Sequence, residues 1–118
     1  MTRSIGPVLA DILEAIDGIE VATRRKSRGQ FEADWVLRHA VQRAIEIISE
    51  ACRHLPDEVL APHPEIPWGK VRAAGNVLRH EYFRVADDVI WSVVVDELPP
   101  LRRAVVGIRA AVDPGYGS

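Results

Sequence analysis

Cysteine is scarce in this sequence and long hydrophobic runs are missing, which argues against a disulfide-stabilised protein and against a membrane-spanning one. Cys52 is the single cysteine, so no intramolecular disulfide can form and a reducing compartment fits best. No apolar run approaches the roughly 20 residues that span a bilayer. Asp11, Glu14 and Asp17 interrupt the N-terminal segment, which therefore lacks the apolar core of a signal peptide. We expect a cytoplasmic protein with no membrane association.

The motifs of several common enzyme classes are also missing. The sequence has no glycine-rich phosphate loop, no Ser–His–Asp pattern and no zinc signature. His39, His54 and His63 show no ligand spacing with one another or with Cys52, so we expect no metal site and no bound cofactor. The net charge of −2 argues against a broad basic surface for nucleic acid. It does not exclude an enzyme that holds a few phosphates with local arginines.

The composition is that of one soluble globular domain. Of 118 residues, 47% are hydrophobic and 27% charged, which excludes a disordered chain and leaves room for one domain, residues 1–118. Apolar residues recur at three- and four-residue spacing, which predicts helices. The predicted helices are residues 7–25, 31–55, 68–80 and a last segment from about residue 86, kinked or restarted at Pro99 and Pro100.

These helices predict an all-α fold. The β-branched run of residues 90–95 favours a strand locally, but no second convincing strand is available to pair with it, so we predict helix there. The expected architecture is an up-and-down bundle of four to five helices with one long proline-rich connection after residue 55. Cys52 falls on the apolar stripe of the segment 31–55, which predicts a small buried hydrophobe rather than a reactive thiol.

The segment 71–91 holds the residues best able to carry chemistry. On a helix, Asn76 and His80 share a face one turn apart, Arg72 lies one turn before Asn76, and Arg79 flanks the stripe. A histidine exchanges a proton near neutral pH, and an arginine holds a phosphate. Cleavage of a phosphodiester without a metal needs such a base and such a cation. The alternative is a structural histidine that caps the last carbonyls of its helix.

The order of sequence blocks resembles the HepT-like family of the HEPN superfamily. The blocks are AVQRAIEIISEACRHLP (40–56), PEIPW (64–68), NVLRHEYF (76–83), VIW (89–91) and DELPPL (96–101). The active-site signature of that family is an arginine, four to six residues, a histidine, one residue and a tyrosine. His80 and Tyr82 match its second half, and Asn76 matches the asparagine common after the arginine. Gly75 stands where the family has the arginine, and seven residues separate Arg72 from His80.

The resemblance implies an HEPN-like bundle that forms a homodimer, with the two signatures facing each other across a cleft. It implies a metal-independent endoribonuclease toxin that cleaves RNA to a 2′,3′-cyclic phosphate. It also implies an antitoxin partner, a minimal (MNT-type) nucleotidyltransferase that uses ATP to transfer AMP to Tyr82. In this hypothesis His80 is the base and Asn76 an orienting donor. Arg72, Arg79 or an arginine of the dimer partner then supplies the phosphate clamp.

Gly75 leaves two other hypotheses open. The first is a catalytically degenerate HEPN dimer that binds a nucleotidyltransferase but has no nuclease activity. The second is a helical interaction protein in which His80 and Tyr82 only pack against their neighbours. Burial and dispersal of Arg72, Asn76 and His80 would favour the second.

Overall fold

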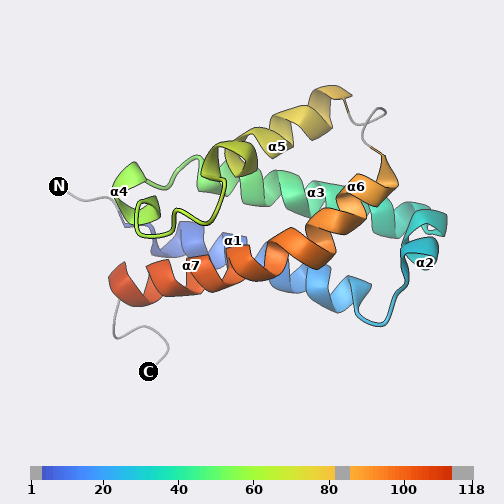
Figure 1. Cartoon of the computed structure of the whole chain (residues 1–118), viewed down its shortest axis with the longest axis horizontal. Coiled ribbons are helices and arrows are strands. Elements are labelled where there is room, and N and C mark those ends of the chain that lie inside the picture. The colour runs from blue at the N-terminus through green and yellow to red at the C-terminus, as the bar shows by residue number, and fades with distance from the viewer. Residues whose placement is uncertain (1–3, 82–85, 113–118) are drawn as a thin grey trace.

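The chain, seen in a computed structural model that describes residues 4–81 and 86–112, folds into helices joined by short loops (Figure 1). Within those residues there is no strand, which confirms the all-α prediction. None of the described helices is both long and apolar enough to cross a bilayer. The elements are α1 (Gly6–Thr23), α2 (Arg28–Ala33), α3 (Trp35–Cys52), α4 (Asp57–Leu60), α5 (Trp68–Glu81), α6 (Asp87–Ser92), the π-helical segment η2 (Val93–Glu97) and α7 (Leu98–Val112).

The long helices alternate in direction, as the predicted up-and-down bundle requires (Figure 1). Helix α3 packs against α1 on one side and against α5 on the other, and α7 also packs on α1. Helix α5 inclines away from the bundle toward its C-terminal end, while α3 continues past that end (Figure 1). The last turn of α5 is therefore the most outlying part of the described bundle.

The apolar stripes read from the sequence form the core. Side chains three and four residues apart lie on one face of a helix, and burial of each large one contributes roughly 1.5–3 kcal/mol to folding. The buried apolar residues of the three helices that build most of the core are Leu9, Ile12, Leu13, Ile16 and Ile19 of α1, Leu37, Val41, Ile45, Ile48 and Cys52 of α3, and Leu98, Leu101, Ala104, Val105 and Ile108 of α7.

The prediction of a single helix over residues 31–55 is wrong at Asp34. Phe31 belongs to the separate short helix α2, and α3 begins only at Trp35. Asp34 has extended backbone angles (φ −104°, ψ 98°), and its carboxylate accepts a hydrogen bond from the Leu37 N–H at 3.0 Å. This cap satisfies a first-turn N–H of α3, so one aspartate ends one helix and starts the next without proline or glycine.

The C-terminal segment is helical without a break over residues 87–112, and at the predicted kink or restart only its hydrogen-bond pattern changes. Residues 90–95 are helical, as predicted, and run from α6 into η2. Pro99 and Pro100 fall in the first turn of α7, where their missing N–H groups cost least, and the wider π-helical turn comes directly before them. The restart is thus a change of hydrogen-bond register.

Cys52 is fully buried, which confirms the prediction of a small core hydrophobe. Burial raises the pKa of the Cys52 thiol from 9.0 to about 12, against a smaller lowering by the positive charge of Arg72. The folded protein therefore keeps this sulfur as a neutral thiol.

We predict that Cys52 does not react with DTNB in the folded protein at pH 8 and reacts fully after unfolding, because the thiolate is the nucleophile. Since the pKa is raised, this group's contribution to stability is complete below pH 9 and falls as the pH rises toward 12. Cys52→Ala removes that part of the pH dependence in urea titrations. Labelling of the native protein at the rate of a free thiol would contradict this account.

We also predict that Asp34→Ala lowers the free energy of unfolding by about 1 kcal/mol, because α3 loses its N-cap. Asp34→Asn is the matched control and keeps most of the stability, since an amide oxygen caps as well. Both are measured by urea denaturation. Equal loss in the two variants would assign the effect to the charge instead of the cap.

Candidate functional site on helix α5

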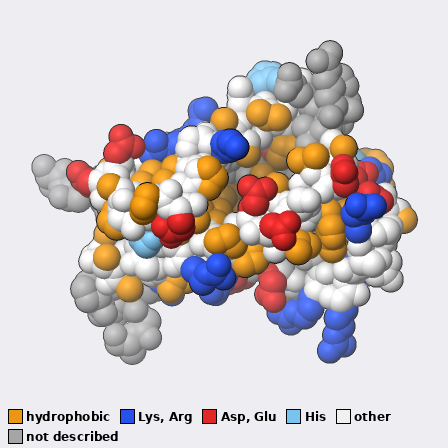
Figure 2. Space-filling model, viewed as in Figure 1, with side chains coloured by type: hydrophobic (Ala, Val, Ile, Leu, Met, Phe, Trp, Pro, Cys, Tyr) orange, Lys and Arg blue, Asp and Glu red, His pale blue; other side chains and the backbone are white. Residues whose placement is uncertain are grey.

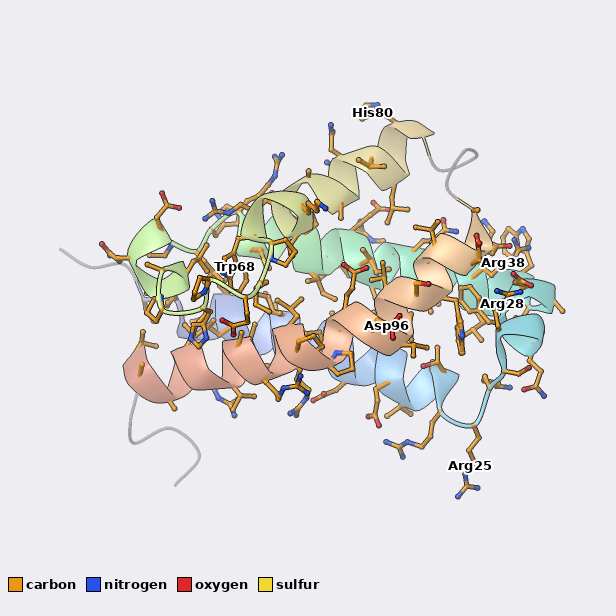
Figure 3. All side chains as sticks on the ribbon, in the orientation of Figure 1. Arg25, Arg28, Arg38, Trp68, His80 and Asp96 are labelled. Carbon is orange, nitrogen blue, oxygen red and sulfur yellow. The ribbon has the colours of Figure 1, made fainter. Side chains whose placement is uncertain are left out.

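His80 and Asn76 lie on the outward face of α5. His80 is near the C-terminal end of the helix, and its side chain points away from the bundle (Figure 3). Asn76, one turn earlier on the same face, is exposed as well. Neither side chain packs into the core of the chain, so the burial that would favour a purely packing role is not found for these two residues.

Gly75 lies on the opposite side of α5, in the contact with α3. Its N–H donates to the Ser49 hydroxyl at 2.9 Å, and the same hydroxyl donates to the Arg72 carbonyl at 2.9 Å. Ser49 is only 2% exposed. A Cβ added at Gly75 would lie 3.0 Å from Ser49 Oγ and 3.1 Å from Ser49 Cβ. The position where the family signature has its arginine is therefore a close helix–helix contact in this chain.

Arg72 belongs to the junction that follows α3. Its Nη2 donates to the Leu55 carbonyl at 2.7 Å and its Nε to the Cys52 carbonyl at 3.3 Å. Its Nη1 lies 3.3 Å from the Asp57 carboxylate. These contacts satisfy carbonyls beyond the end of α3 and tie them to the start of α4. A role for Arg72 as phosphate clamp stays a prediction, and it requires the guanidinium to share these contacts.

Arg79, unlike Arg72, lies away from the junction that follows α3. It is exposed and lines a shallow hollow of about 330 Å³ between α1, α3 and α5. Arg43 of α3 lines the same hollow and makes a loose ion pair with Glu46, at 3.5 Å. Asp11, Glu46 and Glu50 line this hollow as well, so it places two guanidinium groups and three carboxylates beside the last turns of α5, where Arg79 directly precedes His80.

A second hollow, of about 270 Å³, lies between α5 and the η2–α7 segment, on the face shown in Figure 2. Its floor is largely apolar, and its lining includes Glu65, Asp96 and Glu97 against the single cation Lys70. Asp96 lies in the middle of this face (Figure 3). Carboxylates repel phosphates, so this hollow, with three carboxylates and one lysine, suits a nucleic-acid backbone less well than the Arg79 hollow, where two arginines lie among the three carboxylates of Asp11, Glu46 and Glu50.

Two expectations from the sequence remain predictions. The modification site Tyr82 lies outside the described residues. Among the residues that are described, no three His, Cys, Asp or Glu side chains gather in a way that could hold a metal ion. The absence of a cofactor is therefore still an expectation.

Sequence reasoning missed two features near this site. One is Ser49, which is 26 residues from Gly75 in sequence, so no local pattern signals their contact. The other is a ring pair on α3, in which the exposed Trp35 stacks on the half-buried His39 with ring centroids 4.0 Å apart. The four-residue spacing of Trp35 and His39 was the available signal, but an aromatic residue in a helix is more often part of the core.

Fold and site together define a small helical bundle with an outlying helix end that presents a histidine, an asparagine and an arginine. Comparison with known proteins identifies the family. The chain matches the family described as "Ribonuclease HepT-like" over residues 12–108. It belongs to this family, which confirms the resemblance read from its sequence blocks.

Three relatives illustrate the match. The "Probable ribonuclease HepT" of Thermococcus cleftensis is 40% identical over 86% of this chain and 93% of its own length. The "Putative RNase MJ1380" of Methanocaldococcus jannaschii is 30% identical over 87% of this chain and 94% of its own length. The "Putative RNase TTE0752" of Caldanaerobacter subterraneus is 34% identical over 84% and 88%, respectively. No solved structure matches the chain.

We predict that Gly75→Ala destabilises the protein by about 1–3 kcal/mol, because the added methyl overpacks the contact with Ser49. Gly18→Ala in α1 is the matched control. No atom lies within 4 Å of a Cβ at Gly18, so the better helix propensity of alanine stabilises there by about 0.5–1 kcal/mol. Urea denaturation measures both.

A double-mutant cycle with Ser49→Gly tests the cause. The pair Ser49→Gly and Gly75→Ala should cost less than the sum of the two single substitutions, because removal of the serine side chain makes room for the methyl. Additive losses would show that the α3–α5 contact is not the source of the Gly75→Ala effect.

Proposed function

We propose that the protein is a metal-independent endoribonuclease toxin with His80 as its catalytic base. The observation that carries the proposal is the exposure of His80 and Asn76 together, one turn apart at the outlying end of α5, in a chain of the HepT-like family. A base that acts on a large substrate has to be reachable, and this side chain is.

In the proposed reaction, His80 accepts the proton of a ribose 2′-hydroxyl. The 2′-oxygen attacks the adjacent phosphorus, and the bond from phosphorus to the 5′-oxygen breaks. The products are a 2′,3′-cyclic phosphate and a 5′-hydroxyl, which takes up a proton as it leaves. A nearby cation stabilises the negative charge that develops on the phosphate oxygens, and Asn76 donates a hydrogen bond that orients the phosphate or the ribose.

Of the two arginines considered, Arg79 is the better placed to supply this cation. Three of the five N–H groups of Arg72 are used in the junction after α3, whereas Arg79 is exposed beside His80. A guanidinium from a second copy of the chain is the other source, because we propose that the protein acts as a homodimer with the two α5 helices facing a common cleft.

We further propose that an MNT-type nucleotidyltransferase neutralises the toxin by transferring AMP from ATP to Tyr82. Tyr82 follows His80 by two residues, so the added phosphate and base would come close to the catalytic histidine and repel RNA by charge and bulk. The cytoplasm is the proposed location, since the single cysteine is a buried thiol that needs no oxidising compartment.

The test is RNA cleavage by the purified protein in EDTA, after mass spectrometry has shown Tyr82 to be unmodified. His80→Ala should lower cleavage at least about 100-fold, as expected for loss of a general base. His54→Ala is the matched control, because His54 is an exposed histidine beyond the C-terminal end of α3, paired with Glu50 and outside the α5 helix. Arg79→Ala should lower the rate without loss of stability, whereas Arg72→Ala should also destabilise the fold.

The second candidate function is a catalytically degenerate dimer that binds a nucleotidyltransferase. The observation that favours it is Gly75, since the signature arginine is missing and no side chain fits at its position without movement of Ser49. No cleavage by a folded, unmodified dimer would sink the toxin proposal for this chain and leave this function in front.

A further inference from the structure

The ring pair on α3, an exposed Trp35 on a half-buried His39, is the feature of this surface that the core does not account for. Trp35, the first residue of α3, is 63% exposed. Its indole stacks on the His39 ring at a centroid distance of 4.0 Å and an interplanar angle of 28°. His39 is held in turn, because its Nδ1 lies 2.7 Å from the Trp35 carbonyl, which only accepts and so fixes the proton on that nitrogen.

The other two tryptophans have structural partners. The Trp91 ring packs on Phe31 at a centroid distance of 5.3 Å. The Trp68 indole N–H donates to the His63 carbonyl at 3.0 Å. Trp35 instead leaves most of a large apolar ring in water, which is unfavourable unless a ligand covers it.

The ring pair continues into the basic side chains beside the candidate catalytic histidine. Trp35, His39 and Arg43 follow one another at four-residue spacing, so they lie one turn apart along one side of α3. Arg43 and Arg79 line one hollow together with Asp11, Glu46 and Glu50, and Arg43 pairs loosely with Glu46. Arg79 directly precedes His80. Trp35, His39, Arg43 and Arg79 thus form a row of side chains that leads toward His80.

The register of α3 against α5 sets the distances along this path. The two helices are antiparallel and meet at Ser49 and Gly75. His80 follows Gly75 by five residues, which corresponds to the level of residue 44 on α3. At a rise of about 1.5 Å per residue, His39 lies about 7.5 Å and Trp35 about 13.5 Å beyond this level along the axis of α3, and the inclination of α5 adds to the separation from His80. A few nucleotides span this distance, at about 3.4 Å for each stacked nucleotide.

We propose that Trp35 and His39 form a nucleobase-stacking platform for single-stranded RNA, and that Arg43 and Arg79 hold the phosphates that lead from it to His80. The inference rests on the proposed ribonuclease function and adds the site that positions the substrate. Stacking suits a single strand, because unpaired bases expose their faces and every base has one. In a duplex the faces are covered.

The experiment measures RNA affinity in the cleavage-silent His80→Ala protein. The probes are a fluorescein-labelled single-stranded RNA of about 12 nucleotides and a hairpin RNA that is fully paired in its stem, both followed by fluorescence anisotropy. Trp35→Ala should weaken binding of the single strand about tenfold or more and change hairpin binding little. Trp35→Phe should restore most of the affinity, since a phenyl ring still stacks.

Two further variants separate stacking from charge and from general loss of apolar surface. Val36→Ala is the matched control, because Val36 is 69% exposed and adjacent to Trp35 but on a different side of α3, and it should leave the affinity unchanged. Arg43→Ala should weaken binding to both RNAs and reduce the slope of log Kd against log salt by about one, as expected for one lost phosphate contact.

The outcomes also separate this inference from the proposed function. If wild type cleaves RNA but Trp35→Ala binds the single strand within about twofold of its parent, the platform is wrong and the ribonuclease proposal stands. If Trp35→Ala turns a dimer into a monomer with RNA affinity unchanged, the ring pair is a protein contact and the platform is again wrong. If neither cleavage by wild type nor RNA binding is found, both proposals fail.

Discussion

Helices α3 and α5 can approach each other closely because residue 75 has no side chain. At this point the Ser49 hydroxyl bridges two backbone groups of α5, accepting from the Gly75 N–H and donating to the Arg72 carbonyl. Buried hydrogen bonds of this kind are costly to leave unmade, so they fix both the position and the rotation of α5 against α3. The rotation matters most for the site. His80 lies about 140° around the helix from Gly75, so the residue that turns inward to meet Ser49 turns the histidine outward.

The close contact between α3 and α5 also leaves little room at position 75 for the arginine of the family signature. A side chain at position 75 would start in the contact with α3, with Ser49 within 3.1 Å of its first carbon. A side chain there would require Ser49 or helix α5 to shift. Any cation for the chemistry must therefore come from another position. The hollow that Arg43 and Arg79 line together holds two arginines, of which Arg43 pairs loosely with Glu46, while Arg72 serves the junction between α3 and α4.

The sequence predicted those parts of the fold that depend on local periodicity. The buried faces of α1, α3 and α7 follow the three- and four-residue spacing of their apolar residues, and α5 was predicted to within one residue at its C-terminal end. The break at Asp34 was missed because a lone aspartate in an apolar pattern looks like one polar position on a continuous helix. Only the extended backbone and the bond from the Leu37 N–H reveal it as a cap.

The candidate site was likewise predicted only in those features that depend on local spacing. Helical spacing was enough to put Asn76 and His80 on one face, and both are exposed there. The contacts of the Arg72 side chain could not be predicted, because a long guanidinium side chain donates to whichever nearby acceptors lack a donor. Here those groups are the carbonyls of Cys52 and Leu55, 20 and 17 residues away. Contacts between residues so far apart leave no trace in a periodic pattern, and Ser49 was overlooked for the same reason.

Charge finally limits how this surface could hold RNA. The net charge is −2, and Figure 2 shows basic and acidic side chains interspersed over the face that it presents. Several arginines form local ion pairs, such as Arg24 with Glu20 and Arg102 with Asp17. A binding site with the guanidinium groups of Arg43 and Arg79, the first already paired loosely with Glu46, releases few counterions, so phosphate contacts alone would give weak affinity at physiological salt. The remaining free energy has to come from a term that salt does not screen, and base stacking on an exposed ring is such a term. In the proposed platform, stacking on Trp35 and His39 therefore supplies the binding free energy that the small number of cations cannot.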